Sequence, residues 1–95
     1  MRKYEIMLIL PPDADDRAVN GVTERLTQIL AERGGEVLSV DRWGKRRLAY
    51  PIAKRTEGFY LVAEFRAEPD ALREIDRVLS LADEVLRFKV VVRAA

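Results

Sequence analysis

Two hydrophobic periodicities succeed one another along this chain, and their order is the strongest constraint on its fold. Residues 2–10 alternate between apolar and mixed positions, the period-two pattern of a strand with one buried face. From about residue 15 to residue 33 the apolar positions recur at helical spacing instead. Two further strand patterns, a second helical pattern and a last strand follow. The predicted order is therefore strand, helix, strand, strand, helix, strand.

Local signals set the limits of the first strand and helix. Pro11 and Pro12 end the strand, since proline cannot donate a hydrogen bond to a neighbouring strand. Asp15 is one of three aspartates that can cap the helix, and Gly34 with Gly35 stops it. The buried stripe of this helix is expected to consist of Val19, Val22, Leu26, Ile29 and Leu30.

The second half of the chain follows the same logic. A second strand runs from residue 36 to residue 50, with a bend or bulge at Gly44 and Pro51 at its end. A loop is expected over residues 54–58, a third strand over 59–67 and a last strand over 85–92. Between the last two lies a helix opened by residues 68–70. Its expected buried stripe is Leu72, Ile75, Val78, Leu79 and Leu81.

This order of elements predicts an α+β, ferredoxin-like βαββαβ fold, a four-stranded antiparallel sheet with two helices on one face. The handedness of crossover connections puts the first and third strands in the centre. At 95 residues we expect one domain, residues 1–95. The helices must cover the fully apolar strand face, which leaves the mixed face open.

The open face is predicted to be a candidate seat for a partner protein, because apolar side chains rimmed by charge gather there. The alternative is that these are the single exposed apolar residues normal on any protein surface. The apolar residues concerned are Met7, Ile9, Tyr60, Val62 and Val91.

Residues 42–55 hold six cations and no acid, while the rest of the chain has 11 basic and 16 acidic residues, a net charge of −5. Trp43 and Tyr50 lie among these cations. Basic side chains neutralise phosphates and planar ones stack on bases, so this composition favours a nucleic-acid contact. The alternative is a charged hairpin that keeps a sheet edge soluble. Trp43 would stack on a base or partner, or else cap the core, and Tyr50 would pack at the hairpin base.

Several function classes are disfavoured by what the sequence lacks. Without His or Cys, the commonest general base and the thiolate metal ligands are absent, and an intracellular setting is the simplest interpretation. The loop after the first strand carries three aspartates, which would repel a phosphate ligand. No apolar stretch reaches the roughly 20 residues of a membrane span, and no signal peptide is visible. We therefore expect no catalysis, metal site, small-molecule substrate or membrane span.

Two other binding modules with this fold were weighed. A metabolite-sensing or dimerising domain remains an alternative function, although nothing in the sequence indicates which ligand it would bind. Residues 58–62 resemble the third-strand motif of RNA-recognition domains only superficially. Glu57 stands where that motif has a cation, and the alternation buries Phe59 and Leu61 rather than exposing them for base stacking.

Three blocks of residues resemble the bacterial ribosomal protein S6 family. They are Met-Arg-Lys-Tyr-Glu at residues 1–5, Trp-Gly-Lys-Arg-Arg-Leu-Ala-Tyr-Pro-Ile at 43–52 and Glu-Gly-Phe-Tyr at 57–60. The resemblance covers essentially the whole chain and implies the ferredoxin-like fold. It also implies a structural, non-catalytic role without cofactors in the small (30S) ribosomal subunit, hence in the cytoplasm. There the family binds the central domain of the small-subunit ribosomal RNA together with ribosomal protein S18.

The resemblance and the residue pattern together define the expected RNA-binding set. These cations are expected to hold phosphates rather than read bases, with an affinity that falls steeply with salt. A net charge of only +1 implies weak RNA binding alone and cooperative binding with the partner. The candidate RNA-binding residues are Arg2, Lys3, Arg42, Trp43, Lys45, Arg46, Arg47, Lys54, Arg55, Arg87, Lys89 and Arg93.

Overall fold

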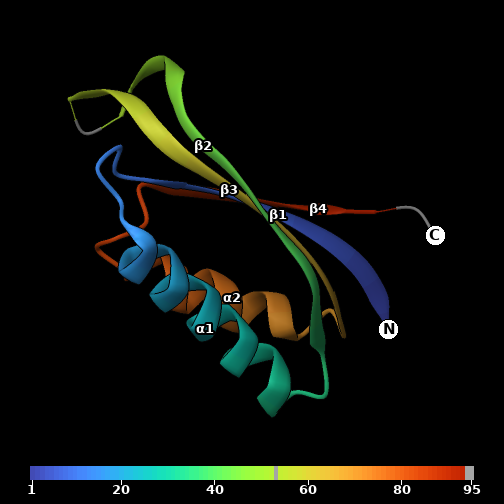
Figure 1. Cartoon of the computed structure of the whole chain (residues 1–95). Coiled ribbons are helices and arrows are strands. Elements are labelled where there is room, and N and C mark those ends of the chain that lie inside the picture. Colours follow the sequence, from blue (N-terminus) through green and yellow to red (C-terminus); the bar gives the residue numbers. More distant parts are fainter. Residues whose placement is uncertain (53, 94–95) are drawn as a thin grey trace.

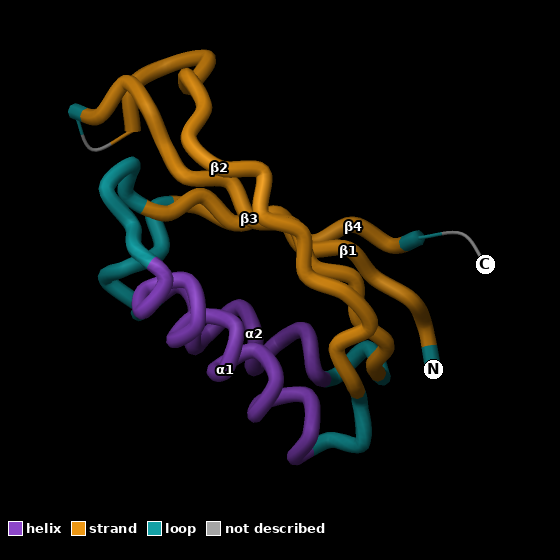
Figure 2. The backbone as a smooth tube through the Cα atoms, viewed as in Figure 1, coloured by secondary structure: helices purple, strands orange, loops and turns teal. Residues whose placement is uncertain are grey.

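The computed structural model describes residues 1–52 and 54–93, so residues 53, 94 and 95 of the predicted domain lie outside the described residues. The sheet is antiparallel, with the strand order β2-β3-β1-β4, and both helices lie on one of its faces (Figures 1 and 2). This confirms the predicted ferredoxin-like fold and its two central strands. The elements are β1 (Arg2–Leu10), α1 (Asp16–Glu32), β2 (Glu36–Ile52), β3 (Arg55–Ala67), α2 (Ala71–Ser80) and β4 (Arg87–Val92).

Both ends of α1 are closed by the residues that the sequence indicated. The carboxylate of Asp15 accepts a 2.9 Å hydrogen bond from the backbone N–H of Ala18 at the first turn. At the other end the N–H of Gly35 donates back to the carbonyl of Leu30 at 2.7 Å. The chain can turn back to form this hydrogen bond only if one residue is left-handed, and Gly34 has that conformation, with φ +74°.

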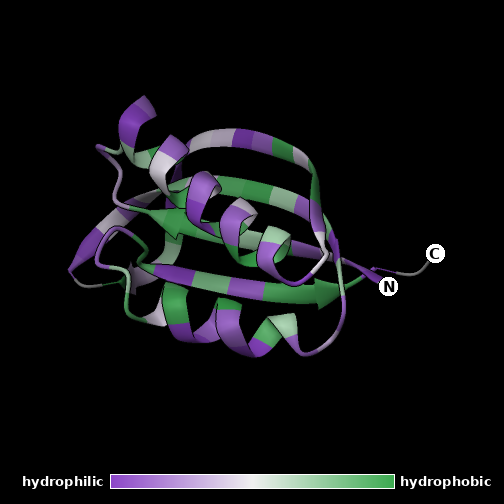
Figure 3. Ribbon diagram, turned by 90° about the horizontal axis from the view of Figure 1, so that it is seen from below, coloured by the Kyte–Doolittle hydropathy of each residue, from purple (hydrophilic) through white to green (hydrophobic). Residues whose placement is uncertain are grey.

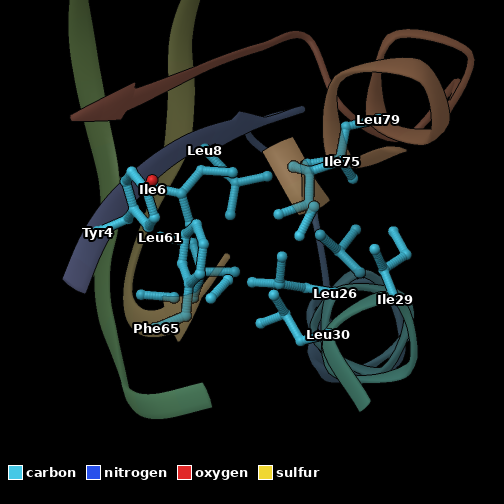
Figure 4. Packing of buried hydrophobic residues seen from close by; sticks show 14 of the residues in the cluster. Tyr4, Ile6, Leu8, Leu26, Ile29, Leu30, Leu61, Phe65, Ile75 and Leu79 are labelled. Carbon is cyan, nitrogen blue, oxygen red and sulfur yellow. The ribbon is translucent and has the colours of Figure 1, made fainter. Parts of the chain in front are cut away.

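The core lies between the helices and the covered face of the sheet (Figure 4). Tyr4 and Phe65, from the two central strands, are both buried, with ring centroids 5.4 Å apart. All five residues of the predicted α1 stripe are buried. Hydropathy colouring shows apolar positions of both helices toward the sheet and polar ones outward (Figure 3). Burial of each large aliphatic side chain contributes about 1.5–3 kcal/mol.

The predicted loop over residues 54–58 is wrong, because β3 begins at Arg55, four residues before the predicted start. Arg55 pairs with Ile52, and Glu57 pairs with Arg47. The sequence hides this part of the strand because residues 55–57 are all exposed, so no apolar alternation marks them. The turn between the two strands is correspondingly short, and Lys54 adopts φ +66° in it.

The end of the second helix also differs from the prediction. Leu81, assigned to the buried stripe, is 74% exposed. It lies two positions after the buried Leu79, about 200° further round the helix axis, and therefore on the opposite side. Ala71, at the start of α2, is buried instead. The last strand begins at Arg87 rather than at Val85, whose N–H closes a turn by donating to the carbonyl of Ala82.

Candidate nucleic-acid interface

The β2–β3 hairpin extends beyond the rest of the sheet. Pairing of β1 with β3 ends at Leu10 and Phe59, whereas β2 and β3 stay paired to Arg47 and Glu57 and, after an irregularity in β2, pair again at Ile52 and Arg55. Figures 1 and 2 show this extension projecting past the ends of the helices. We call residues 46–52 and 54–58 the arm.

The arm and the residue just before it carry a dense group of cations. All five are exposed, and none forms an ion pair with an acidic side chain of residues 1–52 or 54–93. Cations without internal partners remain available for external anions such as phosphates. These residues are Lys45, Arg46, Arg47, Lys54 and Arg55.

Cations point to both faces of this hairpin, as strand alternation requires. Lys45 pairs with Phe59, whose parity is that of the helix-covered face, whereas Arg46 is opposite Gly58 on the open face. The guanidinium of Arg46 lies 5.5 Å from the ring centroid of Trp43. Because the hairpin projects from the body, both of its faces can meet a ligand.

Arg42 was grouped with these cations, but the structure places it elsewhere. It pairs with Leu61, so it faces the helices, and its guanidinium bonds Asp16 at 2.6 Å and Asn20 at 3.1 Å. Asp16 neutralises this cation locally. Arg42 therefore ties β2 to α1 and is separated from the unpaired cations of the arm.

Trp43 follows Arg42 and points the opposite way, to the open face, as strand alternation requires, and a bulge in β2 leaves it without a pairing partner. Arg42 pairs with Leu61 and Gly44 with Tyr60, so Trp43 is the extra residue between two consecutive pairs. Gly44 allows the bulge with φ +84°. The Trp43 ring stacks on the Tyr60 ring, with centroids 6.4 Å apart, and its Nε1–H donates to Asp41 at 3.2 Å. Trp43 therefore does not cap the core, one of the two positions that the sequence analysis considered for it.

The apolar residues predicted for the open face lie together across the two central strands. Met7 pairs with Val62 and Ile9 with Tyr60, so these four form two adjacent rows. Val62 is buried, at 8% exposure, while Val91 on the edge strand β4 is 45% exposed. Neither helix covers this face, so Met7, Ile9, Tyr60 and Val91, with the Trp43 ring beside them, form an apolar surface within reach of a partner, while Val62 is buried.

Leu48 is a part of this surface that the sequence analysis missed. It is buried although it belongs to the arm, and its side chain approaches Gly58. A Cβ on Gly58 would lie 2.5 Å from Cγ2 of Ile9 and 3.3 Å from Cδ2 of Leu48. The absence of that atom lets Leu48 and Ile9 pack over the glycine. The only sequence signal was one leucine among basic residues followed ten positions later by a glycine.

Tyr50 is not at the position that the sequence analysis expected for it. Instead of packing at the hairpin base, it is 56% exposed, and the guanidinium of Arg87 lies 5.8 Å from its ring centroid. The distal part of β2 thus reaches toward the first residue of β4. Lys89, two residues further along β4, lies on the same open face, paired with Met7.

The remaining candidate cations lie at the other end of the sheet. Arg2 pairs with Ala67, the last residue of β3, whose first residue is Arg55 in the arm; at roughly 3.3 Å per residue the two ends are about 40 Å apart along the strand. Lys3 lies 3.4 Å from Glu64, and Arg93 lies 3.8 Å from Glu5. The structure therefore divides the eleven candidate cations into an arm group joined by Arg87 and Lys89, a terminal group that is partly ion-paired, and Arg42.

The described residues provide no arrangement for acid–base or metal chemistry. No group of three or more Asp or Glu side chains in residues 1–52 and 54–93 could hold a metal ion. On the helix layer, away from the arm, a hydrogen bond from Arg77 lowers the pKa of Glu74. Within the same residues, neither helix is long and apolar enough to cross a membrane.

Comparisons with known proteins find relatives over nearly the whole chain. The model of the family described as ribosomal protein S6 matches residues 3–92. The small ribosomal subunit protein bS6 of Corynebacterium urealyticum is 49% identical over 90 residues, 95% of each chain. That of Caldanaerobacter subterraneus is 45% identical over 91 residues, 96% of each chain.

A solved structure is similar over nearly the whole chain. The crystal structure of 30S ribosomal protein S6 from Thermotoga maritima superposes with a TM-score of 0.85 at 33% identity. The matched region covers 97% of this chain and 87% of the Thermotoga maritima chain. The C-terminal domain of the MgtC protein from Mycobacterium tuberculosis, at 14% identity and a TM-score of 0.66, shares the fold alone.

Proposed function

We propose that this chain, which belongs to the ribosomal protein S6 family, binds the central domain of small-subunit ribosomal RNA together with ribosomal protein S18. Membership of that family makes it a structural, non-enzymatic protein of the bacterial small ribosomal subunit, in the cytoplasm. The observation that carries the proposal is a projecting arm of unpaired cations beside an uncovered apolar face. RNA binds the first of these surfaces and the partner protein the second.

The arm supplies the RNA contact. Its exposed cations meet phosphates without first breaking an internal ion pair, so little electrostatic energy is lost on binding. Contacts to phosphates orient the protein on the RNA and carry no sequence information directly. Lys3 and Arg93 add a second contact only by exchanging Glu64 and Glu5 for phosphates, which makes the terminal group the weaker one.

The open face supplies the protein contact. An apolar surface of Met7, Ile9, Tyr60, Val62 and Val91 provides the water-excluding centre that a stable interface needs. Trp43 extends this surface, and aromatic residues of this kind contribute most to binding energy. S18 seated there places its own surface beside the arm. RNA then contacts both proteins at once, and each protein raises the affinity of the other.

A salt titration tests the RNA half of this proposal. Binding to a central-domain RNA fragment is measured from low to high salt, with and without S18, for the wild type and a Lys45→Ala, Arg46→Ala, Arg47→Ala variant. Each lost phosphate contact lowers the slope of log K against log salt by about 0.7–0.9. We expect the slope to fall by roughly two in the variant, and tight binding by the wild type only with S18 present.

The matched control removes the same charge from the helix layer. Arg17, Arg25 and Arg73 are exposed cations of α1 and α2, so changing all three to Ala alters net charge equally but leaves the arm intact. Equal slopes in the two variants would mean that RNA responds to net charge alone. If wild type and arm variant bind alike at every salt concentration, the arm is a solubility device and the proposal fails.

A further inference from the structure

A groove opens where the distal part of β2 meets the open face of β1 and β4. Its volume is about 330 Å³. The floor is apolar, one wall is the exposed ring of Tyr50, and two basic side chains reach its rim. The groove is lined by Met7, Ile9, Tyr50, Arg87, Phe88 and Lys89.

The charge of the groove selects an anionic occupant. Arg87 and Lys89 are exposed, and neither has an acidic partner among the described residues. Both belong to β4 and point to the open face, two residues apart. A neutral apolar segment would provide no negative charge or hydrogen-bond acceptor for these two cations.

The aromatic wall and apolar floor select an occupant that is also planar and apolar. Tyr50 is 56% exposed, so part of its ring surface is open, while Arg87 holds the ring from one side at 5.8 Å. Met7 and Ile9 offer only hydrocarbon and a thioether. An unpaired nucleotide combines a stacking base with a phosphate, which is the chemistry that this mixture of groups matches.

Position gives the last argument. Tyr50 belongs to the arm, between Arg46 and Arg47 on one side and Lys54 on the other along the chain. A strand of RNA held by the arm therefore passes directly beside the groove. We infer that the groove receives one unpaired nucleotide of bound RNA at the edge of the S18 surface, with its base against Tyr50 and its phosphate at Arg87 and Lys89. This inference rests on the proposed function and gives the arm a stacking site that its cations lack.

The two methionines of the chain provide a direct test, since selective ¹³C-methyl labelling gives one signal for each. Met7 lies in the groove, and Met1 lies beside Arg2, Lys3 and Arg93 at the far end of the sheet. The full chain is titrated with hexa-adenylate and, in parallel, with an abasic ribose-phosphate hexamer of equal charge. We expect the ring current of a stacked base to shift the Met7 signal with hexa-adenylate only, and Met1 to move little.

Variants of Tyr50 separate stacking from folding. Tyr50→Leu keeps apolar volume without the ring and should weaken hexa-adenylate binding by roughly fivefold to a hundredfold, the range for losing one base–aromatic stack. Tyr50→Phe keeps the ring and should bind like the wild type. Circular dichroism checks that both remain folded.

The contrary outcomes are distinct from failure of the proposed function. Equal Met7 shifts with the abasic hexamer, or unchanged affinity in Tyr50→Leu, would overturn the groove while the arm still binds RNA with a steep salt dependence. Displacement of hexa-adenylate from Met7 by S18 would assign the groove to the protein partner and overturn the inference equally. Loss of salt-dependent binding altogether would instead remove the proposed function.

Discussion

The indole ring of Trp43 lies nearly parallel to the phenol ring of Tyr60, with 7° between their planes and 6.4 Å between their centroids. The contact joins the bulge of β2 to the central strand β3 on the open face. Trp43 is the one tryptophan of the chain and keeps 42% of its surface exposed. Its fluorescence therefore reports on this face alone.

Tyr60→Leu should shift the emission of Trp43 to longer wavelength, because the indole loses a ring neighbour and gains water. Loss of the aromatic pair should also lower the free energy of unfolding by about 0.5–1.5 kcal/mol. Fluorescence spectra and urea denaturation measure the two effects. Tyr50→Leu removes a ring that pairs with Arg87 instead and serves as the control. An unchanged emission maximum in Tyr60→Leu would contradict the stacked geometry.

Gly58→Ala should destabilise the protein by about 1–3 kcal/mol, the usual cost of overpacking. The new Cβ would lie 2.5 Å from Cγ2 of Ile9, and a β-branched side chain cannot easily turn away. Gly21→Ala is the matched control, since nothing lies within 4 Å of a Cβ there. In the interior of α1 it should stabilise by up to about 1 kcal/mol. Urea denaturation of both variants measures the contrast, and effects of the same sign would contradict it.

Arg42→Ala and Arg46→Ala should differ in RNA binding although they remove the same charge. Arg46→Ala should lower the salt slope by about one, as loss of one phosphate contact does. Arg42→Ala should leave the slope unchanged, because Arg42 is already bound to Asp16. Its cost should be a stability loss below about 1 kcal/mol, typical of an exposed ion pair. Equal slopes in the two variants would place Arg42 in the RNA contact after all.

The pair of Glu74 and Arg77 should make a small contribution to stability that depends on pH. A hydrogen bond from Arg77 and, more weakly, the charge of Arg33 lower the pKa of Glu74 in the folded protein. A lowered folded pKa stabilises the protein above the ordinary glutamate pKa, and this stability is lost as pH falls through the lowered value. Arg77→Gln should raise the pKa of Glu74 and flatten the acid side of the stability profile.

An NMR titration of the Glu74 carboxyl measures that shift directly. Arg73→Gln, one turn earlier on α2 and without an ion pair in the described residues, is the control. A pKa of Glu74 that is the same in Arg77→Gln and the wild type would show that the hydrogen bond does not form in solution.

The elements that the sequence predicted well are those with one buried face. β1 alternates strictly and ends before Pro11 and Pro12, and α1 has an uninterrupted buried stripe between the cap Asp15 and the left-handed Gly34. In these elements, local propensity and tertiary burial give the same answer. The strand order followed from that pattern by topology alone.

The predictions failed where burial does not mark a segment. Residues 55–57 form a strand with both faces exposed, so hydrophobic period carries no signal there. The faces on which Lys45 and Arg46 lie depended on the bulge at Trp43, because one extra residue exchanges the faces of everything after it. In the sequence nothing distinguishes Arg42 from the other cations around it. Only the position of α1 in the structure shows that Arg42 forms an ion pair with Asp16.

The extension of β2 and β3 past β1 has a consequence for how the molecule moves. Its amides bond only across a two-stranded ribbon, whereas those of the core strands are locked between neighbours on both sides. Hydrogen exchange in such a ribbon requires only local opening, while exchange in β1 requires global unfolding. The protein thus combines a rigid body with an arm that can open locally, so under the proposed function the ordering that accompanies RNA binding is expected mainly in the arm.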